Sequence, residues 1–414
     1  MTRHVGRSPQ GRLAVLLPGL GAVATTTIAG VLLARKGLAP PVGSLTQMGE
    51  AGKLLSLAKL EELEFGAWDI FPDNAWDSAT NAKVLEPKHL EQVRDELERI
   101  RPMKGVFSPE YVRRLNGTWV KQGATKAELV EQLREDIRTF MKRRECERGV
   151  AVWCGSTEVH TRPGPVHATV ASFEAGLHRD DPAITPSQMY AWACVREGIP
   201  FANGSPNLAV DFAAADALSR ELGVPIAGKD FKTGQTMMKT VIAPALKARR
   251  LGVRGWFSTN ILGNRDGEVL DDPEAFRSKE LTKRSVLEQL LKASESPALY
   301  GELFHKVRIE YYPPRGDAKE AWDNIDLFGW LGYPMQLKLN FLCRDSILAA
   351  PIVLDLALLL DAAHRAGRSG MQEWLGFFFK SPMSAPGMDP QHDLFRQEQV
   401  LFSALRELAG VNVA

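Results

Sequence analysis

Apolar and polar residues follow one another in blocks along the first half of the chain, and these blocks predict strands followed by helices. Residues 12–37, RLAVLLPGLGAVATTTIAGVLLARKG, fit a buried strand, a glycine-containing turn and an apolar helix that ends at Gly37. Residues 149–157, GVAVWCGST, form a second apolar run of strand length, and helix and strand patterns alternate from there to residue 231. This alternation favours an α/β fold built on a parallel sheet.

The pattern changes after about Met237. Residues 253–264 (VRGWFSTNILGN) and 306–316 (KVRIEYYPPRG) fit strands on either side of a charged segment, and residues 328–343 fit further β structure. Strands so close together predict a separate α+β unit with a more antiparallel sheet. From Ser346 the chain returns to helical patterns.

Three other segments predict helices. Residues 86–101 and 124–144 carry dense mixed charge at helical spacing, which is typical of surface helices. The run from Ile347 to Leu360 is strongly apolar, but it is shorter than a membrane span and Asp355 interrupts it, so we expect a buried helix.

The N-terminal arginines before an apolar run imitate a signal peptide, yet the strand, turn and helix pattern fits that segment better, and we expect a soluble protein.

Composition and charge narrow the classes of function. A chain of 414 residues with 44% apolar and 24% charged residues is long enough for two domains, or for one domain with an insertion. A net charge of +1 gives no general attraction to nucleic acid or to membranes, and we expect neither as a partner. The four cysteines form no CxxC pair and no zinc spacing, which favours reduced thiols in the cytoplasm.

The turn PGLGAVA carries the first chemical signal. Gly19, Gly21 and Ala24 match a GxGxxA pattern, whose small residues let a pyrophosphate approach a helix N-terminus. The acidic residue usually found about 20 residues further on is missing, since Glu50 lies just beyond the expected strand. Asp69, which directly follows an apolar stretch, is the candidate to replace it, although such a residue can also be a plain turn or N-cap residue.

Two further motifs combine glycine or lysine with small polar residues. GKDFKTGQT (228–236) could cradle a phosphate in its backbone N–H groups, or could be an ordinary helix N-terminus; it lacks the ending of a Walker A loop. AFRSKELTKRS (275–285) places Lys279 and Lys283 four residues apart, either on a solvated helix face or in a site for an anionic substrate. Lys380 follows three phenylalanines, where its ammonium is either desolvated or extends to water.

In order along the chain, these segments resemble the inositol-phosphate synthases. The resemblance rests on GLGAVATT, WDI, VWCGSTEV, NGSPN, GKDFKTGQT, NILGNRDG, FRSKELTK, GDAK, CRDSILAAPIVLDL and FFFKSPM, and it covers residue 13 to about 385. It implies conversion of D-glucose 6-phosphate to 1D-myo-inositol 3-phosphate by an isomerase that recycles NAD. The implied steps are oxidation at C5, proton loss from C6, attack of C6 on C1 and reduction at C5.

The resemblance also implies which residues form the site. Its catalytic lysines and their carboxylate neighbours fall on Lys279, Lys283, Lys319, Lys380, Asp230, Asp317 and Asp345. Its substrate-phosphate residues fall on Thr233, Gly234, Gln235, Thr236, Asn260, Asn264 and Asp266. Its cofactor contacts fall on Gly19, Leu20, Gly21, Ala22, Val23, Asp69, Thr157 and Asn203. By family roles, Lys279 and Lys380 serve proton transfer and the C5 oxygen, while Lys283 and Lys319 hold the C1 oxygen and the phosphate.

At the level of the fold, the resemblance implies a Rossmann-like NAD-binding domain with an inserted α+β catalytic and oligomerisation domain. The NAD-binding domain comprises residues 1–236 and 346–414, the insertion comprises 237–345, and the assembly is a homotetramer. The chain departs from the family in its glycine turn and in TGQTMMKT, where only Lys239 remains of the usual lysines.

Several questions stay open at this stage. They include the need for a monovalent or divalent cation, and the pathway served, of which phospholipid biosynthesis is one. Two other functions remain as alternatives: a sugar-phosphate dehydrogenase that releases NADH, and a non-catalytic NAD-binding homologue.

Overall fold

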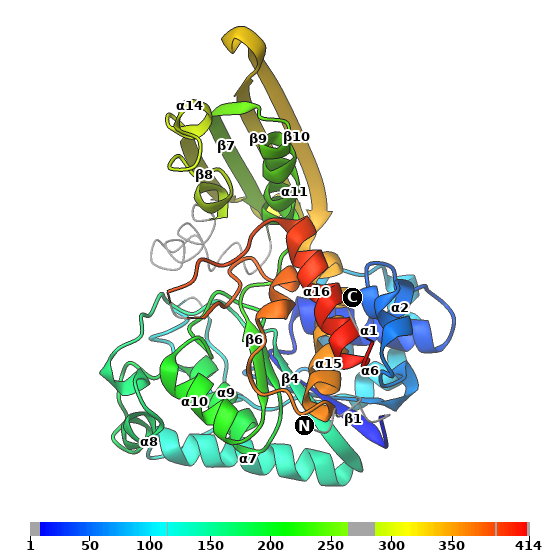
Figure 1. The fold of residues 1–414 in the computed structure, drawn as a ribbon. Coiled ribbons are helices and arrows are strands. Elements are labelled where there is room, and N and C mark those ends of the chain that lie inside the picture. Colours follow the sequence, from blue (N-terminus) through cyan, green and yellow to red (C-terminus); the bar gives the residue numbers. More distant parts are fainter. Residues whose placement is uncertain (1–8, 114, 264–285, 386, 412–414) are drawn as a thin grey trace.

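Two sheets organise the chain: one lies in the main body, and a second projects from it (Figure 1). The computed structural model describes residues 9–113, 115–263, 286–385 and 387–411. The sheet of the main body has seven strands in the order β11-β6-β5-β4-β1-β2-β3, and all its pairings are parallel. Its strands are β1 Arg12–Pro18, β2 Leu63–Asp69, β3 Met103–Lys104, β4 Cys146–Trp153, β5 Phe201–Asn203, β6 Pro225–Gly228 and β11 Gly370–Met371.

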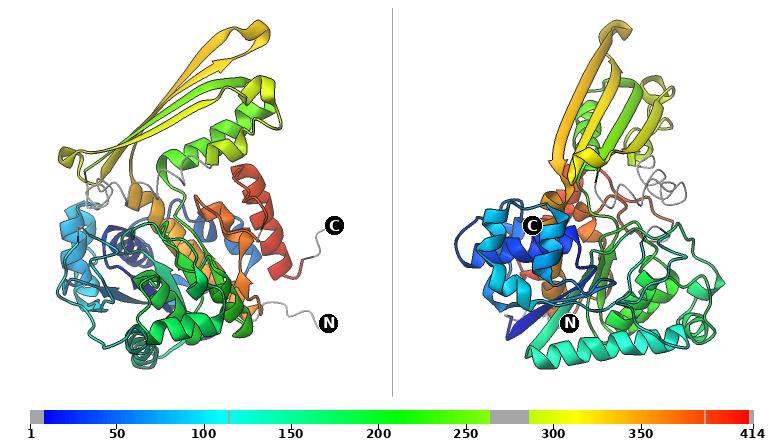
Figure 2. Two further views of the ribbon diagram at one scale, coloured as in Figure 1. Left: turned by 90° about the vertical axis from the view of Figure 1, so that its left-hand side faces the viewer. Right: turned by 180° about the vertical axis from the view of Figure 1, so that it is seen from behind.

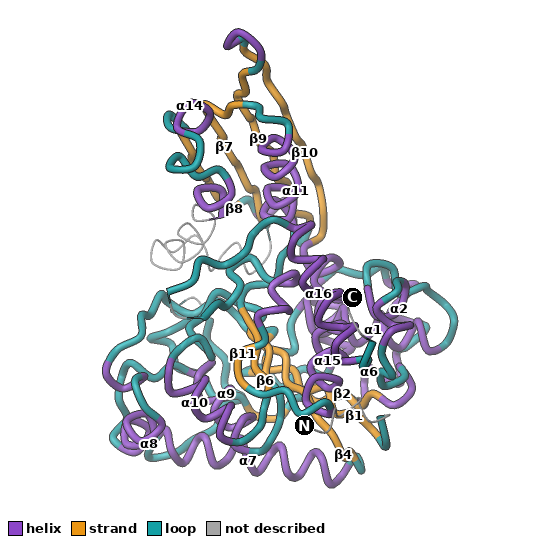
Figure 3. Tube along the Cα trace, in the orientation of Figure 1, coloured by secondary structure: helices purple, strands orange, loops and turns teal. Residues whose placement is uncertain are grey.

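The parallel sheet is covered on both faces, as the apolar runs of its strands predict. In β1, Leu13, Val15 and Leu17 belong to one hydrophobic cluster, whereas Ala14 and Leu16 belong to the other. The first cluster includes residues of α1 Ala22–Arg35, α4 Ala75–Ala82, α15 Asp345–Arg365 and α16 Leu394–Leu408; the second includes residues of α7 Lys126–Arg143, α8 Val170–His178, α9 Pro186–Arg196 and α10 Ala213–Glu221 (Figure 3). The predicted α/β fold with a parallel sheet is therefore confirmed.

Of the two charged segments predicted as surface helices, one is a single helix and the other is divided. Thr125 caps α7 by accepting a hydrogen bond from the Glu128 N–H, in agreement with the predicted helix at 124–144. Residues 86–101 instead form two short helices, α5 Pro87–Glu91 and α6 Arg94–Arg99, because the backbone of Val93 is not helical. The other short helices of the main body are α2 Leu45–Met48, α3 Ala51–Leu54, η1 Leu60–Glu62, η2 Pro165–His167 and η5 Glu373–Phe378.

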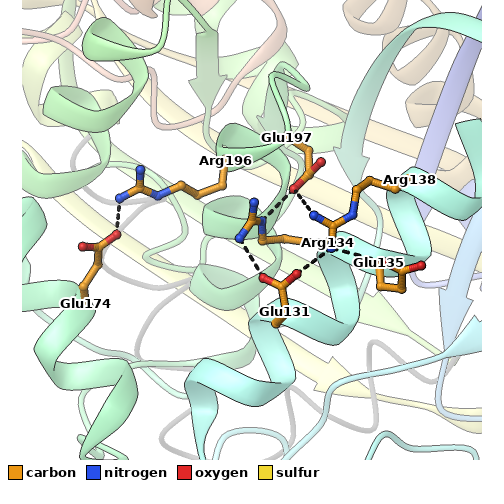
Figure 4. A network of polar contacts seen from close by, with 7 residues as sticks. All are labelled: Glu131, Arg134, Glu135, Arg138, Glu174, Arg196 and Glu197. Atoms are coloured by element: carbon orange, nitrogen blue, oxygen red, sulfur yellow. Dashed lines mark hydrogen bonds and ion pairs between the residues drawn. The ribbon is translucent and has the colours of Figure 1, made fainter.

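The mixed charge of α7 ties this helix to its neighbours (Figure 4). Glu197, next to the end of α9, accepts hydrogen bonds from Arg134 Nε at 2.7 Å and from Arg138 Nη1 at 3.3 Å. Glu131 pairs with both arginines, and Arg196 pairs with Glu174 of α8. Because these groups are partly solvated, each pair contributes only about 0–1 kcal/mol. The network connects α7 to the end of α9, and α9 to α8, on this face of the sheet.

Helix α15 is the buried helix that the apolar run predicted. By length and composition it could cross a membrane, but 72% of its apolar window is buried inside the protein, as expected of a core helix. The carboxylate of Asp355, in the middle of α15, accepts hydrogen bonds from the hydroxyls of Ser44 and Thr46, both at 2.6 Å. The one acidic residue in the apolar run is therefore satisfied internally, and it anchors the loop that precedes α2.

The projecting sheet has four strands in the order β10-β9-β7-β8. Its elements are α11 Gly234–Ala248, β7 Gly252–Leu262, α14 Pro297–Tyr300, β8 Phe304–Tyr311, η3 Pro313–Arg315, β9 Ala318–Phe328, η4 Trp330–Gly332 and β10 Pro334–Arg344. Strand β9 is antiparallel to β7 and β10, but β7 and β8 are parallel, so the sheet is mixed. Helix α11 lies along one face of this sheet (Figure 2). The predicted division between residues 236 and 237 falls inside α11.

Candidate active site

The glycine turn lies between β1 and α1. Gly19 has φ +94°, and a Cβ there would lie 2.5 Å from the Cα of Gly155, so this position requires glycine. Gly21 is the N-cap of α1, and a Cβ on Gly21 would meet no atom within 4 Å. The first turn of α1 contains no acidic residue, and the N-cap provides no side-chain hydrogen bond. The helix N-terminus, with Ala22 and Val23 in its first turn, is thus open to an anion.

Asp69 is the last residue of β2, at the carboxyl edge of the sheet next to this turn. Its Oδ2 accepts a hydrogen bond from the backbone N–H of Leu20 at 2.7 Å, and its Oδ1 accepts from the N–H groups of Ile70 and Phe71. A carboxylate beside the glycine turn at this edge is the type of group that accepts hydrogen bonds from ribose hydroxyls. Asp69 lies further along the chain from the glycine turn than the usual acidic residue does, because short helices are inserted between α1 and β2.

Asn203 ends β5 and is fully buried. Its Nδ2 donates to the carbonyl of Asn207 at 2.7 Å, and Asn207 Oδ1 accepts from the N–H of Glu158, which follows Thr157. The Glu158 carboxylate in turn accepts from the N–H and the hydroxyl of Ser187, at the start of α9. Glu158 and Asn207 were not predicted as site residues, although both lie within the motifs VWCGSTEV and NGSPN.

The residues predicted to contact a cofactor therefore meet at one edge of the sheet. Strands β5, β4, β1 and β2 are neighbours, and their carboxyl ends carry Asn203, the loop with Thr157, the glycine turn and Asp69. The free space in front of Gly21 and the open helix N-terminus fit a pyrophosphate, and Asp69 fits a ribose. This edge is suited to a dinucleotide.

Asp230 and Lys380 connect this edge to a second group of residues. Asp230 follows β6 with φ +63°, and its N–H donates to the carbonyl of Asn203 at 3.2 Å. Lys380 donates from Nζ to Asp230 Oδ1 at 3.2 Å, and its backbone N–H donates to the Asp230 carbonyl. Both side chains are about nine-tenths buried, so Lys380 is paired inside the protein and does not extend to water.

Lys319 and Asp345 form a second lysine–carboxylate pair, with 2.6 Å between Nζ and Oδ2. Lys319 is near the start of β9, and Asp345 begins α15. A Cβ on Gly234 would lie 3.2 Å from Asp345 Oδ1 and 3.6 Å from Lys319 Nζ. The pair therefore lies directly against the first turn of α11.

That first turn contains Thr233, Gly234, Gln235 and Thr236, all of them buried. Thr233 is the N-cap, without a side-chain capping bond, and the first turn has no acidic residue. Gln235 Nε2 donates to Asp323 Oδ2 at 3.1 Å, and Asn260 Nδ2 donates to Gln235 Oε1 at 2.6 Å. The structure thus places Asn260 beside the phosphate-type turn, and the turn presents a helix N-terminus next to an ammonium group.

The thiol of Cys343 lies within electrostatic reach of both lysines. Cys343 is opposite Lys319 in the β9–β10 pairing. Burial raises the pKa of this thiol to about 11, and the charges of Asp345, Lys319, Asp317 and Lys380 also act on it. The Lys319–Asp345 pair, Asp317 and Lys380 therefore all lie on the side of the protein that surrounds Cys343.

Four predicted site residues lie outside the described residues: Asn264, Asp266, Lys279 and Lys283. That Lys279 and Lys283 belong to one catalytic site with Lys319 and Lys380 stays a prediction. Within the described ranges, His, Cys, Asp and Glu form no group of three or more that could hold a metal ion.

Two buried lysines near the site were not predicted to have a role. Burial lowers the pKa of Lys232 to about 7 and that of Lys239 to about 8. Lys232 Nζ donates to Gln397 of α16, and Lys239 Nζ lies 2.8 Å from His305 Nε2 of β8. The signal was present in the motif GKDFKTGQTMMK, which contains both residues, but spacing alone did not show which way their side chains point.

Comparisons with known proteins support a single family. The family model of myo-inositol-1-phosphate synthase matches residues 13–406. Inositol-3-phosphate synthase 1 of Bacteroides thetaiotaomicron is 53% identical over an alignment of 412 residues that covers 97% of this chain and 96% of that protein. Inositol-3-phosphate synthase 1 of Oryza sativa is 33% identical, over 97% of this chain and 86% of that protein. Among solved structures, inositol-3-phosphate synthase of Caenorhabditis elegans is similar, with a TM-score of 0.90 and 26% identity over 98% of this chain and 87% of that chain.

Proposed function

Because the chain belongs to the myo-inositol-1-phosphate synthase family, we propose that its paired lysines and its dinucleotide edge serve one reaction. The protein is an NAD-dependent isomerase that cyclises D-glucose 6-phosphate to 1D-myo-inositol 3-phosphate. One observation supports this site most directly: the Lys319–Asp345 pair lies against the first turn of α11. A phosphate anchor and a cation are thereby brought together, as a phosphorylated aldehyde sugar requires.

The substrate phosphate binds at the N-terminus of α11. The N–H groups of Gly234, Gln235 and Thr236 have no partner one turn earlier in the helix, and the helix dipole favours negative charge there. Lys319 adds a positive charge beside Gly234. Asn264 and Asp266, from the matching family segment, complete this subsite.

The lysines stabilise the oxyanions that develop on the sugar. Bound NAD supplies reversible hydride exchange at C5 of the substrate. Lys380, held by Asp230 next to Asn203, is on the cofactor side and stabilises the C5 oxygen. Lys319 is on the phosphate side and holds the C1 oxygen as C6 attacks. Lys279 and Lys283 join them, as bases or as charge partners, and Asp317 and Asp345 keep the cations oriented.

Burial strengthens the action of these charges on the substrate. Closing the sugar inside a site of paired ions excludes water, so that charges act at low effective dielectric.

A direct assay tests the function. Purified protein with NAD and glucose 6-phosphate should yield an inositol phosphate, detected by NMR, without net accumulation of NADH at 340 nm. Stoichiometric release of NADH would instead identify a sugar-phosphate dehydrogenase. Absence of any turnover, with NAD still bound, would identify a non-catalytic homologue.

The assembly we propose is a homotetramer in which the projecting sheet contacts a second copy. The turn between β9 and β10 exposes Trp330 at 88%, Leu331 at 79% and Tyr333 at 69%, and β10 exposes Leu342 at 61%. Apolar side chains grouped in this way are typical of a contact surface. We also propose the domain division into residues 1–236, 237–345 and 346–414, with the middle segment as the catalytic and assembly unit.

For the cellular setting we propose the cytoplasm. All four cysteines are free thiols, which fits a reducing compartment. Supply of inositol for phospholipid biosynthesis is one use of the product. A divalent-cation requirement is tested by measuring turnover after chelation with EDTA and again after addition of excess Mg²⁺. A monovalent-cation requirement is tested by measuring turnover in K⁺-free buffer and again after addition of K⁺.

A further inference from the structure

Asp323 is a buried carboxylate on β9 with no role in the reaction described above. It is 2% exposed, and its Oδ1 accepts hydrogen bonds from Trp256 Nε1 at 2.7 Å and from Ser258 Oγ at 2.6 Å. Its Oδ2 accepts from Gln235 Nε2 at 3.1 Å. Asp323 thus connects the sheet directly to the first turn of α11.

Gln235 Nε2 faces three acceptors, of which Asp323 Oδ2 is the nearest at 3.1 Å; the carbonyls of Trp322 and Thr259 lie at 3.4 and 3.5 Å. These acceptors fix the orientation of two successive amides. A carboxylate only accepts hydrogen bonds, so Gln235 must present Nε2 to Asp323 and Oε1 to Asn260. Asn260 must then present Nδ2 to Gln235, as observed at 2.6 Å. Asp323, Gln235 and Asn260 together form an orientation relay.

The orientation relay leaves one polar atom unsatisfied. Asn260 is fully buried, and among the described residues its Oδ1 has no hydrogen-bond partner. With both amides turned over, Asn260 Oδ1 would accept from Gln235 Nε2, but Gln235 Oε1 would then face the Asp323 carboxylate. A buried acceptor without a donor is unfavourable. The protein accepts that cost and keeps Gln235 attached to the sheet.

The attachment point lies on the same strand and the same face as Lys319. Residues 319, 321 and 323 of β9 are all buried and alternate with more exposed ones, so Lys319 and Asp323 point to the face that carries α11. Holding Gln235 at Asp323 therefore sets the position of the Gly234 turn relative to the Lys319 ammonium.

We infer that Asp323 is a positioning residue for the phosphate subsite, acting through Gln235. The inference rests on the proposed function, because it takes the first turn of α11 as the place where the phosphate of glucose 6-phosphate binds. Asp323 does not touch the substrate; it keeps the N–H groups of the turn and the Lys319 ammonium aimed at one phosphate.

The test uses the NAD-loaded full chain and isothermal titration with glucose 6-phosphate and, separately, with inorganic phosphate. Asp323→Asn keeps the shape and the acceptor for Trp256 and Ser258, but it places an NH₂ group opposite Gln235 Nε2. We expect both ligands to bind about tenfold more weakly, while NAD affinity stays within twofold. Ser258→Ala is the matched control: it removes a hydrogen bond to the Asp323 carboxylate but none of the bonds between members of the orientation relay, and ligand affinity should stay within twofold.

A double-mutant cycle separates positioning from general support of the fold. Gln235→Met should weaken the binding of both ligands about tenfold. When Asp323→Asn is added to Gln235→Met, binding should weaken by less than a further twofold. A further tenfold loss in the double variant, or wild-type affinity in Asp323→Asn, overturns the inference. If Asp323→Asn does not fold, Gln235→Met decides alone: weaker binding supports the inference, and unchanged binding overturns it.

Failure of the proposed function would look different. A wild-type protein that binds both ligands but forms no inositol phosphate would refute the reaction and leave the binding test intact. A wild-type protein that binds neither ligand would refute both.

Discussion

Lys319 Nζ and Asp345 Oδ2 are 2.6 Å apart, and the pair stands where the projecting sheet meets the main body. Lys319 belongs to β9 of the projecting sheet, whereas Asp345 starts α15, the core helix of the main body. The same two side chains lie against Gly234 at the start of α11. One ion pair therefore joins both parts of the protein at the proposed phosphate subsite.

Replacement of Lys319 should remove transition-state stabilisation. In Lys319→Met we expect turnover of glucose 6-phosphate to fall by about 10²-fold or more, because one electrostatic donor typically contributes that much. NAD affinity, measured by fluorescence titration, should not change. Lys142→Met, at an exposed lysine in the last turn of α7, is the control. A Lys319→Met enzyme with more than a tenth of wild-type turnover would refute the assigned role.

Replacement of Asp69 should weaken cofactor binding. Asp69→Asn loses the charge that accepts the Leu20 N–H and that is proposed to accept hydrogen bonds from ribose hydroxyls. A hydrogen bond to a charged group contributes about 1.5–3 kcal/mol, so NAD affinity should fall at least about tenfold. Asp77→Asn, at an exposed position in α4, should bind NAD like the wild type. Equal NAD affinity in both variants would show that Asp69 serves only the turn.

The buried ammonium of Lys232 should make stability depend on pH. Burial lowers its pKa from 10.5 to about 7, so between these values the unfolded chain binds more protons than the folded chain. The free energy of unfolding should therefore rise with pH across this window, by about 1.4 kcal/mol per pH unit from this group. The cost of the buried charge is greatest below about pH 7.

Lys232→Met removes this contribution. Urea unfolding gives the free energy of unfolding of the variant and of the wild type at pH 7 and at pH 9. Relative to the wild type, the variant should be about 2–3 kcal/mol more stable at pH 7 than it is at pH 9. Only the difference between the two pH values is diagnostic, because loss of the bond to Gln397 acts equally at both. The same difference at both pH values would mean that Lys232 has an ordinary pKa in the folded protein.

A charge in the turn between β9 and β10 should disrupt the proposed assembly. Trp330→Asp places a carboxylate at a side chain that is 88% exposed, so the isolated fold should be unaffected. Light scattering after size exclusion should show a shift from tetramer to smaller species. Met48→Asp, at another exposed apolar side chain in the main body, should leave the mass unchanged. An unchanged mass for Trp330→Asp would move the contact to another surface.

Many elements could be predicted because their signals are local. The run at 12–37 contains its strand, its turn and its helix within one segment, and the observed β1 and α1 match it. The apolar run from Ile347 to Leu360 predicted α15 because burial on all sides leaves no polar face. The division of 86–101 into α5 and α6 was missed, since one non-helical residue does not change the periodicity of charge.

The predicted site residues lie in local motifs, whereas their contacts involve distant segments of the chain. Motifs and the family resemblance predicted Asp69, Asp230, Lys319 and Lys380 as site residues, but the partners of these residues lie far away in the chain. Asp69 meets Leu20, Lys380 meets Asp230, and Lys319 meets Asp345 only after the strands have paired. The mixed character of the second sheet was likewise hidden, because the direction in which β8 pairs with β7 depends on the path of the chain between them.

The sequence by itself determined the class of fold, the glycine turn, the buried helix α15 and the residue types of the site, because periodicity and short motifs are encoded in neighbouring residues. Tertiary structure alone decided that Lys380 is paired and buried, that Gln235 faces Asp323, and that Lys232 and Lys239 lose their water. The physical reason is that pairing, orientation and desolvation depend on atoms brought together from distant segments, and no local pattern specifies them.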